Sequence, residues 1–412
     1  MKEIIVIGGG AAGMMAALSA RKAGAHVTLA EHNEKLGKKL YITGKGRCNL
    51  TNDADADAFF AHIPRNPRFL YSAFSHFDNQ ALMSLMESLG VPLKVERGGR
   101  VFPVSDRSSD ITRALERELL RWGIDVRLHS AIEAILAPSG QVAGVQYQGG
   151  AIQQADAVIV ATGGKSYSPT GSTGDGYAFA RALGHEIVPP RPALIPLETM
   201  EEWPGELMGL SLKNVTLNYY KGKKKLFSEL GELLFTHFGL SGPLCLSLSS
   251  YLPDEPMGQK IFIDLKPALS EQTLDNRLLR DFKEMSRKQL ISVLDGLAPH
   301  NLALKIAHLA NLSPAQPVHS ITAAQRAVLL ELFKRLPLTV KRFRPLEEAI
   351  ITRGGVSVKQ VNPSTMESKL VSGLYFAGEV LDVDALTGGF NLQIAFSTGA
   401  LAGNAAASAF ER

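Results

Sequence analysis

The first residues that could do chemistry form a glycine-rich turn near the start of the chain. Gly8-Gly9-Gly10-Ala11-Ala12-Gly13 follows a short apolar run and precedes a stretch rich in alanine and methionine. In such a turn Gly8 permits the tight bend, Gly10 lets the backbone approach a pyrophosphate, and Gly13 lets a helix pack closely on a strand. The free N–H groups at the start of that helix attract phosphates. We therefore expect a dinucleotide cofactor here, bound by Gly8, Gly10, Ala11, Ala12 and Gly13.

An acidic residue follows at a distance that suits the same cofactor. Residues 3–8 and 26–31 are expected to be buried strands, with a helix over residues 11–23 between them, which makes a βαβ unit of about 30 residues. Glu31 lies at the end of the second strand. It is placed to accept hydrogen bonds from an adenosine ribose. This fingerprint alone does not distinguish FAD from NAD(P).

Two later glycine turns favour FAD. Residues 157–164 and 373–379 each read as an apolar strand that ends in glycine, and residues 388–393 open the final helix. Flavoproteins with two dinucleotide-binding halves use such a late strand to hold the ribityl chain, and the positive end of the next helix stabilises negative charge on the reduced flavin. The residues expected to bind FAD in these turns are Thr162, Gly163, Gly164, Gly378, Glu379, Asp382, Gly389, Phe390, Asn391 and Leu392.

A further segment, residues 37–52, is dense in glycines, cations and amide side chains and directly follows the ribose acid. We expect it to run along the cofactor toward the isoalloxazine. Glycines allow the backbone to come close, and cations offset phosphate charge. The residues expected to contact FAD in this segment are Lys38, Lys39, Gly44, Gly46, Arg47, Cys48 and Asn49.

Composition narrows the class of protein. The chain has 412 residues, of which 45% are hydrophobic and 20% charged, which is ordinary for a globular protein of two or three domains. Cys48 and Cys245 give no disulfide or metal spacing, and no HExxH motif occurs, so no metal is expected. Three consecutive glycines interrupt the N-terminal apolar run where a signal peptide needs a continuous helix. No segment approaches the ~20 apolar residues that span a bilayer. We expect a cytoplasmic protein without a membrane segment.

The order of the expected elements predicts an α/β protein with one interrupted domain. Residues 1–190 and 345–412 are expected to form a Rossmann-like FAD-binding domain. After His185 the chain becomes proline-rich, and short strand-like runs follow. We expect residues 191–268 with 336–344 to form a β-rich insert domain, and the leucine- and alanine-rich residues 269–335 to form a helical subdomain.

The net charge of +4 is unevenly distributed. Residues 191–344 contain 20 Lys and Arg against 15 Asp and Glu, a net charge of +5, which leaves −1 for the rest. The cations of this region include Lys221, Lys223, Lys224, Lys225, Lys341, Arg342 and Arg344. Such a bias permits a polyanionic partner. Solvated lysines around a turn are an alternative explanation.

Four segments carry a specific resemblance. They are TGKGRCNLTN (43–52), ATGGKSYSPTGSTGDGYAFARALGH (161–185), FTHFGLSGP (235–243) and FAGEVLDVDALTGGFNLQIAFSTG (376–399). Together they resemble the BaiN/RdsA-type (YhiN-like) family of NAD(P)/FAD-dependent oxidoreductases, and the likeness extends over essentially the whole chain. The resemblance implies a Rossmann-like FAD-binding domain that is interrupted by a β-barrel-like domain with a helical subdomain.

The resemblance also implies a reaction, the reduction of an activated carbon–carbon double bond with NAD(P)H as a transient electron donor. The preferred substrate is a uridine of large-subunit ribosomal RNA, which becomes dihydrouridine. The alternative is an unsaturated 3-oxo steroid or bile acid, or another small enone. In both cases flavin N5 delivers a hydride to the β-carbon, and a proton goes to the α-carbon. A non-redox FAD-containing RNA-binding or sensor protein and an NAD(P)-only dehydrogenase are further alternatives.

Two residues are the main candidates for the proton donor. Cys48 would lie near the flavin and could donate if it keeps its proton, or it could be a small buried side chain that packs beside the ring. His237, in the segment 235–243, could face the flavin from the insert, or it could be a structural hydrogen-bonding residue. Tyr167 and Arg100 are further polar candidates.

Overall fold

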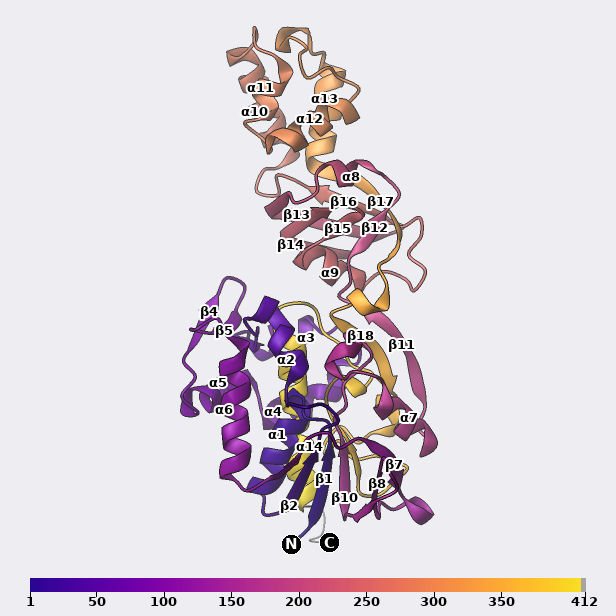
Figure 1. The fold of residues 1–412 in the computed structure, drawn as a ribbon. Helices are drawn as coiled ribbons and strands as arrows, with labels where there is room; N and C mark the ends of the chain where they lie inside the picture. Colours follow the sequence, from indigo (N-terminus) through magenta and orange to yellow (C-terminus); the bar gives the residue numbers. More distant parts are fainter. Residues whose placement is uncertain (409–412) are drawn as a thin grey trace. The chain divides into compact units, whose positions relative to one another are not determined.

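The computed structural model describes residues 1–408, which form two compact units (Figure 1). The first unit contains Met1–Ala193 and the described residues from Leu346 onward, and the second contains Leu194–Pro345. The chain therefore leaves the first unit once and returns to it once. The predicted fold class, a Rossmann-like domain interrupted by a barrel-like insert, is confirmed by the sheets described below. The predicted boundaries of the helical subdomain, after residue 268 and after residue 335, stay predictions.

A five-stranded parallel sheet forms the core of the first unit, in the order β19-β10-β1-β2-β6. Its strands are β1 (Glu3–Ile7), β2 (His26–Ala30), β6 (Asp125–Arg127), β10 (Ala157–Val160) and β19 (Leu374–Phe376). Every residue of β10 and β19 is buried, as are all but the first residue of β1 and β2. Uninterrupted apolar runs are typical of parallel strands that are covered on both faces. Because the strands are parallel, the turns that follow β1, β10 and β19 share one edge of the sheet.

The first and last helices of the first unit pack against each other. They are α1 (Ala11–Lys22) and α14 (Phe390–Ser408), which lie side by side in Figure 1. A Cβ atom at Gly399 would overlap the Ala12 carbonyl oxygen, and one at Gly403 would overlap the Ala16 carbonyl oxygen. Only glycine at these two positions lets the helix backbones come this close.

The other elements of the first unit surround this core. Its further helices are α2 (Lys38–Ile42), α3 (Ala56–Ala61), α4 (Tyr71–His76), α5 (Asn79–Ser88), α6 (Ser108–Arg121) and α7 (Asp175–Ala182). Three small antiparallel sheets contain β3 (Thr51–Asn52), β5 (Arg100–Pro103) and β4 (Leu93–Glu96); β7 (Ile132–Leu136), β8 (Gly144–Tyr147) and β9 (Ile152–Gln154); and β11 (Ile187–Ala193) with β18 (Ile351–Val356). The hairpin β4–β5 was not predicted, because no residue of β4 is fully buried and the strand carries no apolar run.

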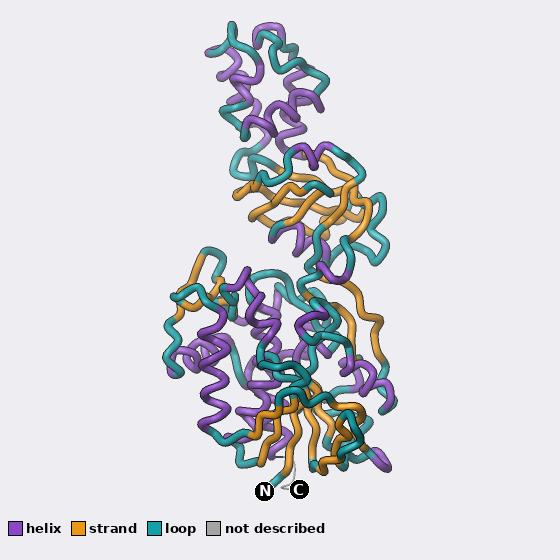
Figure 2. The backbone as a smooth tube through the Cα atoms, viewed as in Figure 1, coloured by secondary structure: helices purple, strands orange, loops and turns teal. Residues whose placement is uncertain are grey.

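The second unit is built on a closed six-stranded antiparallel barrel (Figure 2). The strand order is β12-β15-β14-β13-β16-β17, and the last strand pairs with the first. The bounds are β12 (Leu197–Thr199), β13 (Ser211–Lys221), β14 (Lys224–Thr236), β15 (Gly239–Ser241), β16 (Lys260–Asp264) and β17 (Leu336–Phe343). Along β13, Val215, Leu217 and Tyr219 are buried while the residues between them are more exposed, which is the alternation that a barrel wall needs.

Helices fill the remainder of the second unit. They are α8 (Trp203–Glu206), α9 (Pro243–Ser249), α10 (Glu271–Glu284), α11 (Leu290–Leu294), α12 (His300–Leu309) and α13 (Ala323–Arg335). The last four lie between β16 and β17 in sequence, where the leucine- and alanine-rich pattern predicted helices. A capping box formed by Thr322 and Gln325 fixes the start of α13. None of the helices within residues 1–408 is both long and apolar enough to cross a membrane.

Candidate functional site

The glycine turn after β1 forms an open cradle at the start of α1. A Cβ atom at Gly8 would lie 2.6 Å from the Ala161 carbonyl oxygen, and one at Gly13 would overlap the Gly8 carbonyl oxygen. At Gly10 a Cβ would meet no atom within 4 Å. Gly10 is also the N-cap of α1, and no side chain caps the helix there. The chain thus fills the space at Gly8 and Gly13 but leaves it free at Gly10, where the N–H groups of the helix can meet a pyrophosphate.

Glu31 lies directly after β2 and next to this cradle. Its side chain is almost buried, with 7% of the residue exposed. The carboxylate accepts hydrogen bonds from the backbone N–H of Gly9 (2.6 Å) and from the backbone and side-chain N–H groups of Asn33 (2.8 and 2.7 Å). A carboxylate offers about four acceptor positions. One position is therefore left for a ribose hydroxyl, which fits the predicted role.

An ion pair joins the later turns to the segment after Glu31. Glu379, in the turn after β19, accepts hydrogen bonds from Lys39 Nζ at 2.7 Å and from the Thr352 backbone N–H at 2.8 Å. Lys39 Nζ also donates to Ser166 Oγ at 2.8 Å, and this hydroxyl lies 3.2 Å from Glu379. The side chains of Lys39 and Glu379 are 23% and 21% exposed. Residues from α2, β18 and the turns after β10 and β19 therefore meet in one cluster.

The sequence predicted only part of this cluster. Lys39 and Glu379 were expected to contact the cofactor, and the structure brings them together. Ser166 and Thr352 were missed. Thr352 Oγ1 accepts hydrogen bonds from the backbone N–H groups of Lys165 and Ser166, at 2.8 and 3.0 Å, and so fixes the turn that begins at Gly163. Ser166 could have been found, since it lies two residues after Gly164, but no local pattern marks Thr352.

Two buried hydroxyl groups point to a ligand at the same edge of the sheet. Thr162 Oγ1, just beyond β10, and Tyr177 Oη, on α7, are buried without a hydrogen-bond partner among the described residues. Leaving a buried hydroxyl unpaired costs about 1–3 kcal/mol. Burial, together with the charges of Glu379 and Asp382, raises the pKa of Tyr177, so this hydroxyl stays protonated and can donate. Thr162 was predicted to bind FAD, whereas Tyr177 was missed.

The segment after α2 is strained. Lys45 and Cys48 have φ angles of +59° and +60°, in the left-handed region that side chains rarely adopt, and the neighbouring Gly44 and Gly46 lie in the same region. Each such non-glycine residue costs about 1–2 kcal/mol and persists only where its surroundings hold it in place. This strain identifies residues 43–48 as a segment whose backbone path is imposed by its contacts.

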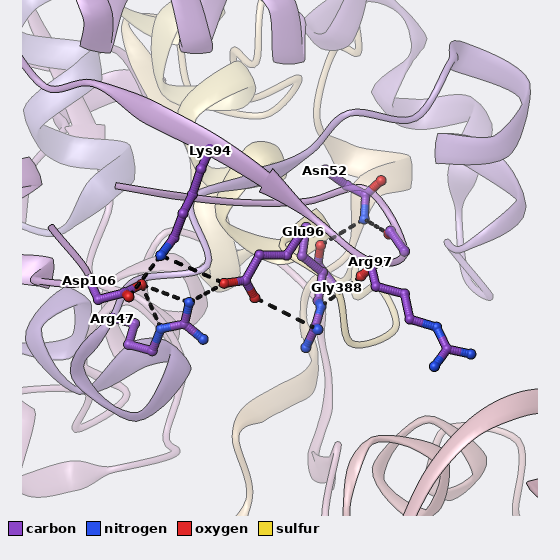
Figure 3. A network of polar contacts seen from close by, with 9 residues as sticks. Arg47, Asn52, Lys94, Glu96, Arg97, Asp106 and Gly388 are labelled. Atoms are coloured by element: carbon purple, nitrogen blue, oxygen red, sulfur yellow. Dashed lines mark hydrogen bonds and ion pairs between the residues drawn. The ribbon is translucent and has the colours of Figure 1, made fainter. Parts of the chain in front are cut away.

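Contacts with the start of α14 hold the end of this segment. Asn49, with its side-chain amide oriented to satisfy both polar atoms, accepts a hydrogen bond from the Gly389 N–H at 3.0 Å. Thr51 Oγ1 donates to Gln393 Oε1 at 2.7 Å. Asn52 Nδ2 donates to the Gly388 carbonyl at 3.0 Å, a bond drawn in Figure 3. The end of this segment and the start of α14 are therefore packed against each other through buried polar contacts.

The other residues predicted at this helix start mainly serve local structure. Phe390 is buried and stacks on His62, with ring centroids 4.4 Å apart. Asn391 accepts from the Ala385 N–H at 2.9 Å and donates to the Ala385 carbonyl at 2.8 Å. Asp382 accepts from Asn66 Nδ2 at 3.2 Å, and burial raises the pKa of Asp382. The feature of this region that stays available to a ligand is the N-terminal, positive end of the 19-residue helix α14.

Arg47 lies in an ion-pair network on the β4–β5 hairpin (Figure 3). Its guanidinium contacts Glu96, donates to Asp106 at 2.8 Å and covers the ring of Phe102 at 4.2 Å. Lys94 donates to Asp106 at 2.7 Å. These bonds raise the pKa of Arg47 and lower the pKa values of Glu96 and Asp106. Carboxylates of the chain therefore already balance the charge that was expected to offset phosphate.

Lys38 is also bonded to side chains of the protein, and Arg100 belongs to the β4–β5 hairpin. Lys38 Nζ donates to Asn33 Oδ1 and Glu34 Oε2, both at 3.0 Å. Arg100 Nε donates to the Arg97 carbonyl at 3.1 Å. The sequence indicated Arg47 but not the carboxylates that face it, because Glu96 lies on a strand that was not predicted and Asp106 lies in the loop between β5 and α6.

The two main candidates for the proton donor occupy different environments. Cys48 is completely buried, and burial raises the pKa of its thiol to about 12, so it keeps its proton at neutral pH. Its complete burial favours the packing alternative. His237 is exposed between β14 and β15 in the second unit, with its ring 4.9 Å from that of Phe238. Tyr167 is half-buried and lies just before a short 3-10 helix. The catalytic roles of these residues stay predictions.

The described residues contain no group of three or more His, Cys, Asp or Glu side chains arranged to hold a metal ion. The parallel sheet, the open glycine cradle, Glu31 beside it and the unpaired hydroxyls at one edge are features of a dinucleotide-binding domain, and the comparisons below give the class of protein. It is a FAD-binding oxidoreductase with a Rossmann-like domain. Residues 2–405 match the family described as HI0933-like protein Rossmann domain, and the chain belongs to this family. The family predicted from the sequence is thereby confirmed.

Two curated relatives and one solved structure illustrate the likeness. The chain is 32% identical to the 3-dehydro-bile acid delta(4,6)-reductase of Clostridium scindens, over 99% of both chains. It is also 32% identical to the ribosomal RNA dihydrouridine synthase of Haemophilus influenzae, over 96% of both chains. The 3-ketosteroid-delta4-(5alpha)-dehydrogenase of Rhodococcus jostii is 13% identical, with a TM-score of 0.52 over 99% of this chain and 97% of the other, which shows a shared fold.

Proposed function

We propose that this protein reduces an activated carbon–carbon double bond with electrons from NAD(P)H, and that its substrate is a uridine of large-subunit ribosomal RNA. The observation that carries this proposal is the 32% identity, over 96% of both chains, to a relative named ribosomal RNA dihydrouridine synthase. A second relative of that name, from Escherichia coli, is 30% identical over 96% of both chains. The excess positive charge of residues 191–344 supports an RNA substrate, because phosphate contacts supply much of the affinity for RNA.

The residues at the edge of the parallel sheet would hold FAD, which when bound supplies the hydride. The N–H groups at the start of α1 would bind the pyrophosphate in the space beside Gly10, and Glu31 would accept from the ribose. Thr162 and Tyr177 would gain the hydrogen-bond partners that the chain does not give them. The start of α14 would place its positive end beside the part of the flavin that becomes negative on reduction.

A small enone is the second candidate substrate. It is favoured by the 32% identity, over 99% of both chains, to a reductase named for a 3-dehydro bile acid. An unsaturated 3-oxo steroid and a uracil base both contain a double bond conjugated with a carbonyl group, so the same hydride and proton transfers suffice. The two candidates differ in what must bind outside the reacting atoms, a polyanion in one case and an apolar ring system in the other.

Deletion of the gene distinguishes the two substrates. We expect dihydrouridine in large-subunit ribosomal RNA, measured by mass spectrometry of its nucleosides, to be lost in the deletion strain. A plasmid copy of the wild-type gene should restore it. Unchanged dihydrouridine in the deletion strain contradicts the RNA assignment. The purified yellow protein would then be tested with unsaturated 3-oxo steroids, and stopped-flow reduction with NADH and NADPH would identify the electron donor.

A further inference from the structure

Aromatic rings and cations alternate on the outer wall of the barrel. Tyr220 on β13 and Phe262 on β16 are half-buried, with ring centroids 6.1 Å apart in an edge-to-face arrangement. Lys225 Nζ lies 5.9 Å from the centre of the Tyr220 ring, and the Arg335 guanidinium lies 5.4 Å from that of Phe262. The adjacent Tyr219 and Ile261 are buried, so the two rings lie on the outward face of their strands.

Three further lysines extend this row at the tip of the β13–β14 hairpin. Lys221 pairs with Lys224 across the two strands, and Lys223 lies in the two-residue loop between them. All three are exposed, and within the described residues none has a side-chain hydrogen bond or ion pair. Like charges directly opposite each other destabilise a hairpin. The repulsion among these lysines therefore destabilises the hairpin, and no ion pair within the described residues relieves it.

Several other cations of the second unit are paired with carboxylates. Lys334 Nζ lies 2.7 Å from Asp264, Arg326 lies 2.8 Å from Asp275, and Arg342 lies 2.8 Å from Glu198. Arg335 itself contacts Glu331 at 3.6 Å. The lysines of the hairpin tip thus form a concentrated positive charge beside aromatic rings. We call this set the barrel surface; it consists of Tyr220, Lys221, Lys223, Lys224, Lys225, Phe262 and Arg335.

We propose that the barrel surface binds single-stranded RNA, with Lys221, Lys223 and Lys224 on phosphates and the Tyr220 ring beside an unpaired base. This inference rests on the proposed function, in which RNA is the substrate. Cations interleaved with aromatic rings are the arrangement that holds single strands, because the cations follow the backbone while the rings stack on bases. A lipid surface needs apolar side chains next to the cations. Here the nearest outward pair is polar, Asn218 and Ser228, which are hydrogen-bonded to each other at 2.8 Å, and the exposed Leu230 lies farther along the same face.

Removal of the three tip charges tests the phosphate contacts. The variant K221Q/K223Q/K224Q is compared with K283Q/R287Q/K288Q, which removes three exposed cations at and after the end of α10, also without side-chain partners among the described residues. Binding is measured for flavin-containing protein with a uridine-rich single-stranded oligoribonucleotide and with protein-free large-subunit ribosomal RNA from the deletion strain. At ~0.1 M salt we expect roughly a hundredfold weaker binding of the oligonucleotide to the tip variant, and a salt slope smaller by about 2, if each lysine contacts one phosphate.

Removal of the aromatic ring tests base stacking separately. The variant Y220L keeps an apolar side chain against Phe262 but offers no ring to a base. We expect about tenfold weaker binding of the uridine-rich oligonucleotide. The salt slope should not change, because no phosphate contact is lost. Flavin content and the thermal midpoint show that each variant is folded.

The outcomes separate this inference from the proposed function. Weaker RNA binding by the tip variant, with the α10 control equal to wild type, supports the inference. Equal RNA affinity of tip variant and wild type overturns it, as does an equal loss in both triple variants. A loss of binding to phosphatidylglycerol vesicles with unchanged RNA binding also overturns it. If the wild-type gene restores dihydrouridine while the tip variant binds RNA normally, only the docking surface is wrong; if dihydrouridine never depended on the gene, the proposed function itself fails.

Discussion

The turn at residues 8–13 and the segment at residues 43–52 both contain several glycines, yet they differ in how much of their surroundings the protein itself fills. At the first turn, Gly10 faces free space and the start of α1 has no side-chain cap. In the second segment, nearly every polar group already has a partner: Arg47 contacts carboxylates, and Asn52 contacts carbonyl groups. The difference teaches that a glycine motif marks either a ligand cradle or tight packing of the chain on itself. What decides at a single glycine is whether a side chain placed there would meet protein atoms, as at Gly13, or open space, as at Gly10.

The largest effect is expected where packing fixes the glycine. A valine in the G13V variant would overlap the Gly8 carbonyl oxygen, and the backbone of α1 cannot move without disturbing its close packing on α14. We expect a loss of more than about 4 kcal/mol in the free energy of unfolding. Soluble yield and the urea midpoint measure it. A folded G13V protein of near wild-type stability would contradict the distinction between glycines that packing requires and glycines that face open space.

The same substitution three residues earlier serves as its counterpart. In G10V the new side chain enters open space, so we expect the free energy of unfolding to change by about 1 kcal/mol or less. FAD should bind roughly a hundredfold more weakly, because the valine occupies the space beside the helix start where the pyrophosphate would lie. Titration of the flavin-free protein with FAD measures this affinity. Wild-type affinity in G10V would mean that the cradle is not the cofactor site.

A smaller effect is expected at the ion pair that joins the turns. K39M should lower the free energy of unfolding by about 2 kcal/mol, because it leaves a largely buried Glu379 carboxylate without its cation. E379Q should cost less after Lys39 has been removed than before, with a coupling of at least ~0.5 kcal/mol. Denaturant unfolding of the two single variants and the double variant completes the cycle. Additive effects would show that Lys39 and Glu379 do not act together.

The smallest effect is expected in the network around Arg47. Its members are exposed to solvent and salt, so R47M should shift the thermal midpoint by no more than about 3 °C. The pKa values of Glu96 and Asp106 are lowered in the folded protein, so their contribution is present above the ordinary carboxylate range and is lost as the pH falls. The midpoints of wild type and R47M should therefore converge below about pH 4. A large, pH-independent loss would place Arg47 among the residues that fix the fold.

Local patterns predicted the first βαβ unit closely. The expected strand, helix and strand at residues 3–8, 11–23 and 26–31 are found as β1, α1 and β2, each one residue shorter. The reason is that apolar runs and glycines are signals within a few residues of the structure that they cause. The short strand-like runs expected in the insert are also found, among them β13, whereas the barrel itself was implied by the family resemblance.

Long-range features of the candidate site could not be read in this way. Lys39 and Glu379 are 340 residues apart, and Asn52 is 336 residues from Gly388. The sequence named both members of the first pair without indicating that they meet. It could not show that Tyr177 is buried without a partner, because that depends on what the surrounding elements fail to offer. The partly buried strand β4, which carries the Glu96 carboxylate that contacts Arg47, was not predicted because it has no apolar run.

The packing of α1 on α14 has a consequence for synthesis of the protein. Ala11 leaves the ribosome about 380 residues before Phe390, where the partner helix begins. At about 5–20 residues per second the interval is roughly 20–80 s. During this time the apolar surface of α1 lacks the helix that later covers it, and Lys2 lacks the Ala406 carbonyl to which it will donate. The apolar face of α1 that packs on α14 therefore stays uncovered by its partner helix until translation is nearly complete.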